Sequence, residues 1–310
     1  MRIASTQTLL ACLLIGLLAA CVLPAAQVPA APSPLPDPSS TALLANLPPT
    51  ATLQPSTTPT ETLIPSATPR SPDEWKSWPE LPAVPGSVQA IYNNGQQLGN
   101  DPHAFSVLGD CQSEPDVFLG VYDRDPQTVA TLPAGLQETA AYFAGSFDRP
   151  SPTVRSGSTA AALLWAEWTE GKYGCRPNET PLTCELRIHR PSFAFVHVGT
   201  HYEDRNMTYL LRIVAQQIDH GVVPILVTKA DDREGDDRIN HDYALLAVQY
   251  NLPLWNFWAA TANLPGRGLY IRPELSFLGD IYLTGPARLI HRLSALEALD
   301  AIRRALRTVP

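Results

Sequence analysis

The stretch FAFVHVGTHYEDRNMTYLLRIVAQQIDHGVVPILV, residues 193–227, decides the fold class. It opens with the apolar run 193–198 and closes with a second apolar run, 222–227, and both have the length and composition of buried strands. Between them, residues 209–218 repeat apolar side chains at the spacing of one helix face. A strand, a helix and a second strand in this order predict two parallel neighbours in one sheet.

The same alternation continues on both sides of this unit. The apolar patterns predict further strands and helices, which are strands at 105–108 and 254–258 and helices at 135–143, 160–168, 241–250 and 293–306. Strands that alternate with helices are typical of a parallel sheet covered by helices on both faces. We therefore expect an α/β three-layer sandwich with a mostly parallel central sheet. Ligands of such sheets bind beyond the carboxyl ends of the strands.

The first 21 residues predict export. Arg2 precedes an apolar stretch, residues 8–20, which is shorter than the roughly 20 residues of a membrane span but fits a secretory signal. The stretch ends in Leu18-Ala19-Ala20-Cys21, which resembles the lipobox of bacterial lipoproteins. This resemblance implies that Cys21 becomes the first mature residue and carries lipid. We expect an extracytoplasmic protein that is anchored to the membrane at the cell surface.

Residues 22–72 predict a disordered tether. They hold thirteen of the 31 prolines and three charged side chains, Asp37, Glu61 and Arg70. Proline favours extended, semi-rigid segments, and the apolar surface is too small to offset the entropy of ordering the chain. Whether this tether is glycosylated stays open. Residues 73–310 then form the folded domain.

The charge balance excludes one class of partner. A formal net charge of −8 and an isoelectric point near 5.3 argue against binding to nucleic acid, which requires clustered lysine and arginine. The chain carries no pattern that predicts a cofactor. The expected partners are a membrane, through the lipid anchor, and a carbohydrate or acyl-ester ligand.

Four segments lie at or near the predicted carboxyl edge of the sheet, namely 109–113, 155–157, 199–202 and 268–276. In their order and spacing they resemble the blocks of the SGNH (GDSL) hydrolases, an esterase and lipase family with a flavodoxin-like α/β fold. The resemblance covers about residues 90–308. It implies ancestral ester hydrolysis on acylated carbohydrate or lipid, with Asp110, Gly157 and Gly199 at the substrate site.

The chain departs from that family at its catalytic positions. Cys111 stands where the family has its nucleophilic serine, and His201 stands where it has an asparagine. Ile271 and Glu274 fall on the positions of the family's aspartate and histidine. These departures favour a catalytically impaired binding module. Two alternatives stay open: an active esterase that depends on Cys111, with His201 and Glu274 as its partners, and a purely structural envelope lipoprotein.

Two further patterns bear on structure. Cys175 and Cys184 lie nine positions apart in a polar loop, which predicts a local disulfide in an oxidising compartment, with two thiols or a bridge to Cys111 as the alternatives. The acidic loop 231–237 does not follow a calcium-binding pattern, so we interpret it as solvated, and no metal site is expected. We expect His291 on the surface or at a helix end, and Trp165 and Trp168 to pack.

Overall fold

The computed structural model describes residues 70–271 and 281–307. The predicted signal sequence and Cys21, nearly all of the predicted tether, and Glu274 lie outside these residues. The central sheet contains four parallel strands in the order β1 (Asp101–Gly109), β2 (Pro191–His197), β3 (Val223–Val227) and β4 (Leu254–Trp255). A two-stranded antiparallel ribbon, β5 (Leu269–Ile271) with β6 (Ile281–Leu283), lies outside this sheet.

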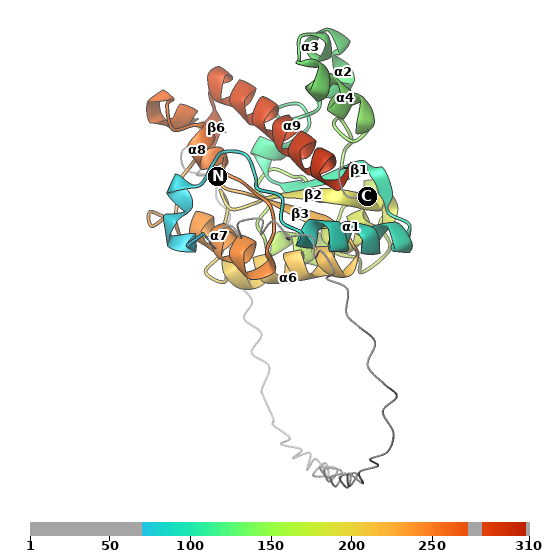
Figure 1. Cartoon of the computed structure of the whole chain (residues 1–310). Coiled ribbons are helices and arrows are strands. Elements are labelled where there is room, and N and C mark those ends of the chain that lie inside the picture. The colour runs from blue at the N-terminus through green and yellow to red at the C-terminus, as the bar shows by residue number, and fades with distance from the viewer. Residues whose placement is uncertain (1–69, 272–280, 308–310) are drawn as a thin grey trace, which may run out of the picture. The chain divides into compact units, whose positions relative to one another are not determined.

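Helices cover both faces of the sheet (Figure 1). The longer ones are α1 (Ser87–Leu98), α4 (Ala134–Tyr142), α5 (Pro181–His189), α6 (Asn206–Asp219), α7 (Arg238–Tyr250) and α9 (Gly285–Arg307). The shorter ones are η1 (Pro72–Ser77), η2 (Cys111–Ser113), α2 (Val121–Arg124), α3 (Pro126–Ala130), η3 (Ala162–Leu164), η4 (Ala166–Trp168), η5 (Gly171–Tyr173), α8 (Phe257–Ala260) and η6 (Pro265–Gly268).

Strand β2 divides the interior into two cores, because successive side chains of a strand point to opposite faces. Phe193 and Phe195 pack into one core together with residues of α4, α8 and α9. Ala194 and Val196 pack into the other together with residues of α5, α6 and α7. A central strand that is buried on both faces is typical of a parallel sheet, and the predicted α/β sandwich is therefore confirmed.

The chain reverses its direction of travel across the sheet at β1. Gly109 at the end of β1 makes an isolated parallel bridge to Val154, while β1 pairs with β2 along its length. Val154 and β2 therefore lie on opposite sides of β1. After β1 the chain first runs to the side of Val154 and then crosses to the other side to form β2. In open parallel sheets such a reversal opens a crevice at the carboxyl ends of the two strands, where ligands bind.

Most predicted elements are present, and three differ. The helix expected at 160–168 is two short turns, η3 and η4. The strand expected at 254–258 ends at Trp255, because Asn256 caps α8 by accepting from the Ala259 N–H. The loop around Cys184 contains α5, whose first turn is capped by Thr180. Across the described residues, none of the helices is long and apolar enough to cross a membrane.

Candidate functional site

A cavity of about 280 Å³ lies beside the end of β1. Its described lining residues come from the η2 region, the turn after Val154, β6 and the start of α9, and they are Cys111, Gln112, Glu114, Val117, Ser156, Tyr282, Leu283 and Arg288. Most of them carry a hydrogen-bonding or charged group, while Val117 and Leu283 are apolar. Concave sites with a few convergent polar groups are the usual binding sites of small molecules.

Asp110 fixes the turn that presents Cys111. Its Oδ1 accepts a hydrogen bond from the Gln112 N–H at 3.1 Å, which caps η2. The side chain is buried, and its Oδ2 has no hydrogen-bond partner among the described residues. Burial raises the pKa of Asp110 to about 7, because desolvation disfavours the charged carboxylate. Asp110 therefore holds the backbone beneath Cys111 and is closed off from the cavity itself.

Gln112 joins the cavity to the ribbon. Its Nε2 donates to the carbonyl of Ile281 at 3.2 Å, and its side chain is nearly fully buried. Arg288 supplies a positive charge to the cavity lining, and its Nε donates to the Leu283 carbonyl at 3.2 Å. Glu114 supplies a carboxylate, whose Oε1 accepts from the Ser156 N–H at 3.2 Å. Hydrogen bonds to the backbone therefore orient three polar side chains of the lining.

No histidine is among the described residues that line this cavity. His197 is the last residue of β2, with its Nδ1 3.1 Å from the Ser113 hydroxyl, and burial lowers the pKa of His197 to about 4. His291 is fully buried, stacked on Phe118 with the ring centroids 4.2 Å apart. The expectation of a surface or helix-end position for His291 is therefore wrong. Both imidazoles are core residues in an aromatic cluster.

The acidic loop 231–237 is only partly solvated, which corrects the interpretation from sequence. Lys229 is buried in the loop after β3, and its Nζ donates to Asp231 at 2.8 Å and to Glu234. Asp231 also accepts from the Thr200 hydroxyl at 2.9 Å. The carboxylates of Asp231 and Glu234 are buried because this lysine compensates their charge. The network ties the loops after β2 and β3 together.

The predicted site residues divide into three groups. Cys111 lines the cavity, and Gly157 follows the lining residue Ser156. Gly199 lies after β2 and His201 lies two residues further on, where its Nδ1 is 3.5 Å from Arg233 Nη1. His201 is not among the described lining residues. Glu274 is outside the described residues, so the grouping of Cys111 with His201 and Glu274 stays a prediction.

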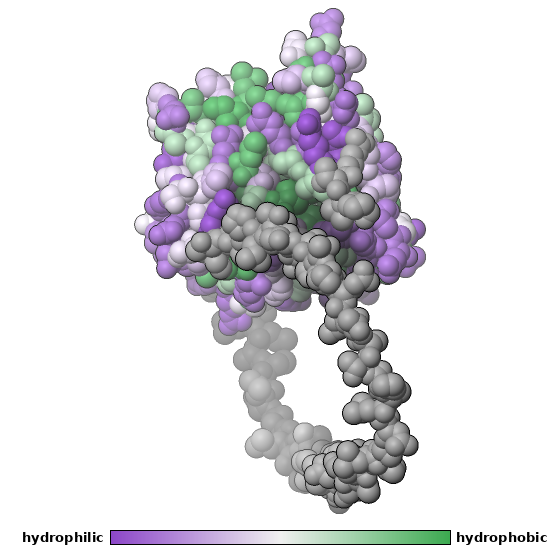
Figure 2. Space-filling view, viewed as in Figure 1, coloured by the Kyte–Doolittle hydropathy of each residue, from purple (hydrophilic) through white to green (hydrophobic). Residues whose placement is uncertain are grey.

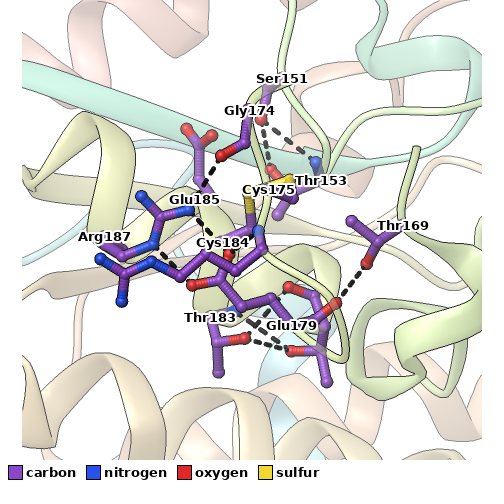
Figure 3. Close-up of a disulfide and its surroundings, with 12 residues drawn as sticks. Ser151, Thr153, Thr169, Gly174, Cys175, Glu179, Thr183, Cys184, Glu185 and Arg187 are labelled. Atoms are coloured by element: carbon purple, nitrogen blue, oxygen red, sulfur yellow. Dashed lines mark hydrogen bonds and ion pairs between the residues drawn. A yellow bond between two sulfur atoms is a disulfide. The ribbon is translucent and has the colours of Figure 1, made fainter. Parts of the chain in front are cut away.

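The predicted disulfide between Cys175 and Cys184 is present and joins the loop before α5 to that helix (Figure 3). Glu179 lies close to both sulfur atoms, but the sulfurs are bonded to each other. This bond removes the thiolates that a metal would need at these three residues.

Sequence reasoning missed Tyr282 and Arg288. Both follow the segment 268–276 that was assigned to the site, and β6 and the start of α9 bring them to the cavity. The short apolar run Ile281–Leu283, which only Thr284 separates from Gly285-Pro286, was the available signal for a strand that ends at a helix start. Trp165 was expected to pack but is 56% exposed.

The chain is similar in structure to solved proteins, while neither comparison of its sequence gives a match. No protein-family profile matches the chain, and no curated protein matches it. Among solved structures, the chain is similar to a GDSL-like lipase from Bacteroides thetaiotaomicron, with a TM-score of 0.41 and 14% sequence identity. The alignment covers 71% of this chain and 98% of the lipase.

Proposed function

We propose that this protein is a lipid-anchored, extracytoplasmic binding protein whose cavity beside Cys111 takes an acylated carbohydrate without hydrolysing it. The observation that carries the proposal is the composition of the described cavity lining, in which hydrogen-bonding and charged groups lie beside two apolar side chains. We propose the absence of hydrolysis on the departures at Cys111, His201 and Glu274 from the catalytic positions of the family that the sequence resembles.

The polar lining supports a ligand rich in hydroxyl groups. Arg288 and Gln112 offer hydrogen-bond donors, while Glu114 and Ser156 offer acceptors. Val117 and Leu283 add a smaller apolar surface that suits an acyl substituent. A carbohydrate bearing an ester therefore matches the cavity better than a purely apolar ligand does.

The first experiment measures turnover and binding with the full chain. We expect no hydrolysis of a small activated acyl ester above background, and we expect acetylated xylose or acetylated glucosamine to raise the melting temperature. Replacing Arg288 by alanine should abolish that rise. Arg212→Ala is the matched control, because Arg212 is exposed on α6, which covers the other face of the sheet from α9.

Ester turnover that disappears in both Cys111→Ala and His201→Ala would overturn the binding role and establish a cysteine esterase. If none of these sugars shifts the melting temperature, the proposed binding role is contradicted and the structural alternative remains. The anchor is tested separately by Cys21→Ala, which should move the protein from the membrane fraction to the soluble fraction.

A further inference from the structure

The segment 158–180 is a long connection with little regular structure. It contains only the short turns η3, η4 and η5 before α5 begins. Connections of this length are uncommon in compact domains and, when ordered, are usually functional. The segment follows directly on Ser156, which lines the cavity.

Covalent and ionic links hold this segment in one conformation. The disulfide between Cys175 and Cys184 closes its end onto α5, and Glu179 accepts two hydrogen bonds from Arg187, at 2.6 Å and 2.7 Å (Figure 3). The Thr169 hydroxyl donates to the Glu179 carbonyl at 2.7 Å. Side chains carried by such a segment are positioned in advance, which lowers the entropic cost of binding.

The two tryptophans of the segment have different environments. The indole N–H of Trp168 donates to the Ser158 hydroxyl at 3.2 Å, and the Arg155 guanidinium lies 4.2 Å from the centre of its ring. Trp168 therefore links the segment to the turn that lines the cavity. Trp165 has no such role, since it is 56% exposed and makes none of these contacts. An exposed indole on a constrained segment leaves a large flat apolar surface open to solvent.

Charged side chains surround this part of the segment. Glu170 pairs with Arg155 at 3.5 Å and with Lys172 at 2.6 Å, and both pairs are at the surface. Glu167 adds a further carboxylate two residues after Trp165. A sugar ring presents an apolar face of C–H groups and a rim of hydroxyls, so it fits one indole with polar groups around it.

We propose that Trp165 forms a second, distal subsite on which a saccharide unit of the ligand stacks, so that the protein binds an oligosaccharide rather than a single sugar. This inference rests on the proposed function, because it extends the ligand from the cavity at Ser156 along segment 158–180. The anchors of protein–protein interfaces lie in larger, well-packed apolar patches. Within segment 158–180, Trp165 is the one exposed large apolar side chain, whereas two others, Leu289 and Leu293, are exposed on α9, where Figure 2 shows apolar surface.

The test compares chain lengths. The full chain is titrated with the monomer and the hexamer of two series, acetylated xylo-oligosaccharides and chito-oligosaccharides, and calorimetry measures the affinity for each. We expect a hexamer of at least one series to bind about tenfold more tightly than its monomer. Trp165→Ala should remove that tenfold advantage and leave binding of the monomer unchanged, while Trp165→Phe should retain most of it because the flat ring remains.

Leu98→Ala is the matched control, because Leu98 is also exposed, at 51%. It is the last residue of α1, just before β1 begins, and therefore lies near the amino-terminal ends of the strands, away from the cavity at their carboxyl ends. Hexamers that bind Trp165→Ala as tightly as the unaltered protein would overturn the inference while the proposed function stands. Failure of every monomer and hexamer to bind would overturn both. Equal binding of monomer and hexamer to the unaltered protein would overturn the second subsite alone.

Discussion

A single glycine determines how the chain leaves β2. Gly199 has a φ of 140°, and a Cβ at this position would lie 2.6 Å from Cγ2 of Ile239. We expect Gly199→Ala to lower the free energy of unfolding by about 1–3 kcal/mol, through backbone strain and this clash. Gly171→Ala is the control, since a Cβ there meets nothing within 4 Å. Equal urea midpoints for the two variants would contradict this explanation.

At the residue scale, the segments assigned to the site from the sequence contain three of the eight described residues that line the cavity. Glycine and aspartate after an apolar run placed Cys111 at the carboxyl edge of the sheet, and the turn at Gly157 placed its neighbour Ser156 there too. Tyr282 and Arg288 were not predicted, because their position depends on how β6 and α9 pack against η2. Long-range packing of this kind leaves no periodic signal in the sequence. The burial of Lys229 was not predicted, because it depends on carboxylate partners in the same loop, and the sequence alone does not show that they turn towards the lysine.

At the element scale, η1 is an integral part of the folded domain. Trp75 is 3% exposed and meets the ring of Trp258 edge-on, with the centroids 5.1 Å apart. Asn256, which follows β4, donates to the carbonyls of Trp75 and Trp78 at 2.9 Å and 3.1 Å. These contacts attach the first described residues to the far edge of the sheet.

We therefore expect Trp75→Ala to lower the free energy of unfolding by about 3–5 kcal/mol, as removal of a buried tryptophan does. The control is Trp165→Ala, which removes the same side chain from an exposed position and should change stability by less than about 0.5 kcal/mol. Denaturant melts of the two variants make the comparison. A similar loss in both would show that burial of Trp75 does not stabilise the domain.

The elements that the sequence predicted best are fully buried strands and helices with one continuous buried face. β2 and β3 are buried at every position and contain continuous apolar runs such as residues 193–196, and α6 repeats its apolar residues at helical spacing. The helix α5 was missed because it begins within a polar loop, at Pro181 after its cap Thr180. The expected helix at 160–168 failed for the opposite reason. Its apolar residues include Trp165, which the fold leaves exposed, so the apolar count overstated the buried face.

At the scale of the whole molecule, buried groups at the site set opposing dependences of stability on pH. Burial raises the pKa of Asp110 to about 7, above an unfolded value near 3.9, so its contribution to stability is lost as the pH rises from about 4 to about 7. Burial lowers the pKa of His197 to about 4, below an unfolded value near 6.5. The contribution of His197 is therefore lost as the pH falls from about 6.5 to about 4.

These two slopes oppose each other in the same interval of pH, so the unaltered protein shows only their difference. Two partly buried groups act in the same directions, because desolvation raises the pKa of Asp242 to about 6 and lowers that of His189 to about 4. Replacing Asp110 by asparagine removes one slope and leaves the others in place. The asparagine keeps the oxygen that caps η2, so the capping hydrogen bond from the Gln112 N–H is retained.

We expect the stability of Asp110→Asn, relative to the unaltered protein, to rise between pH 4 and pH 8, with most of the change below about pH 7. Chemical denaturation of both proteins at pH 4, 5, 6, 7 and 8 measures this difference, and the other titrating groups cancel because both proteins contain them. Gly171→Ala provides a control, because it replaces no titrating group and a Cβ there meets nothing within 4 Å, so its difference should not vary with pH. A difference for Asp110→Asn that does not vary with pH would mean that Asp110 stays ionised in the folded protein. The Lys229 ammonium and the Thr200 hydroxyl, both of which lower the pKa of Asp110, would then outweigh the effect of its burial.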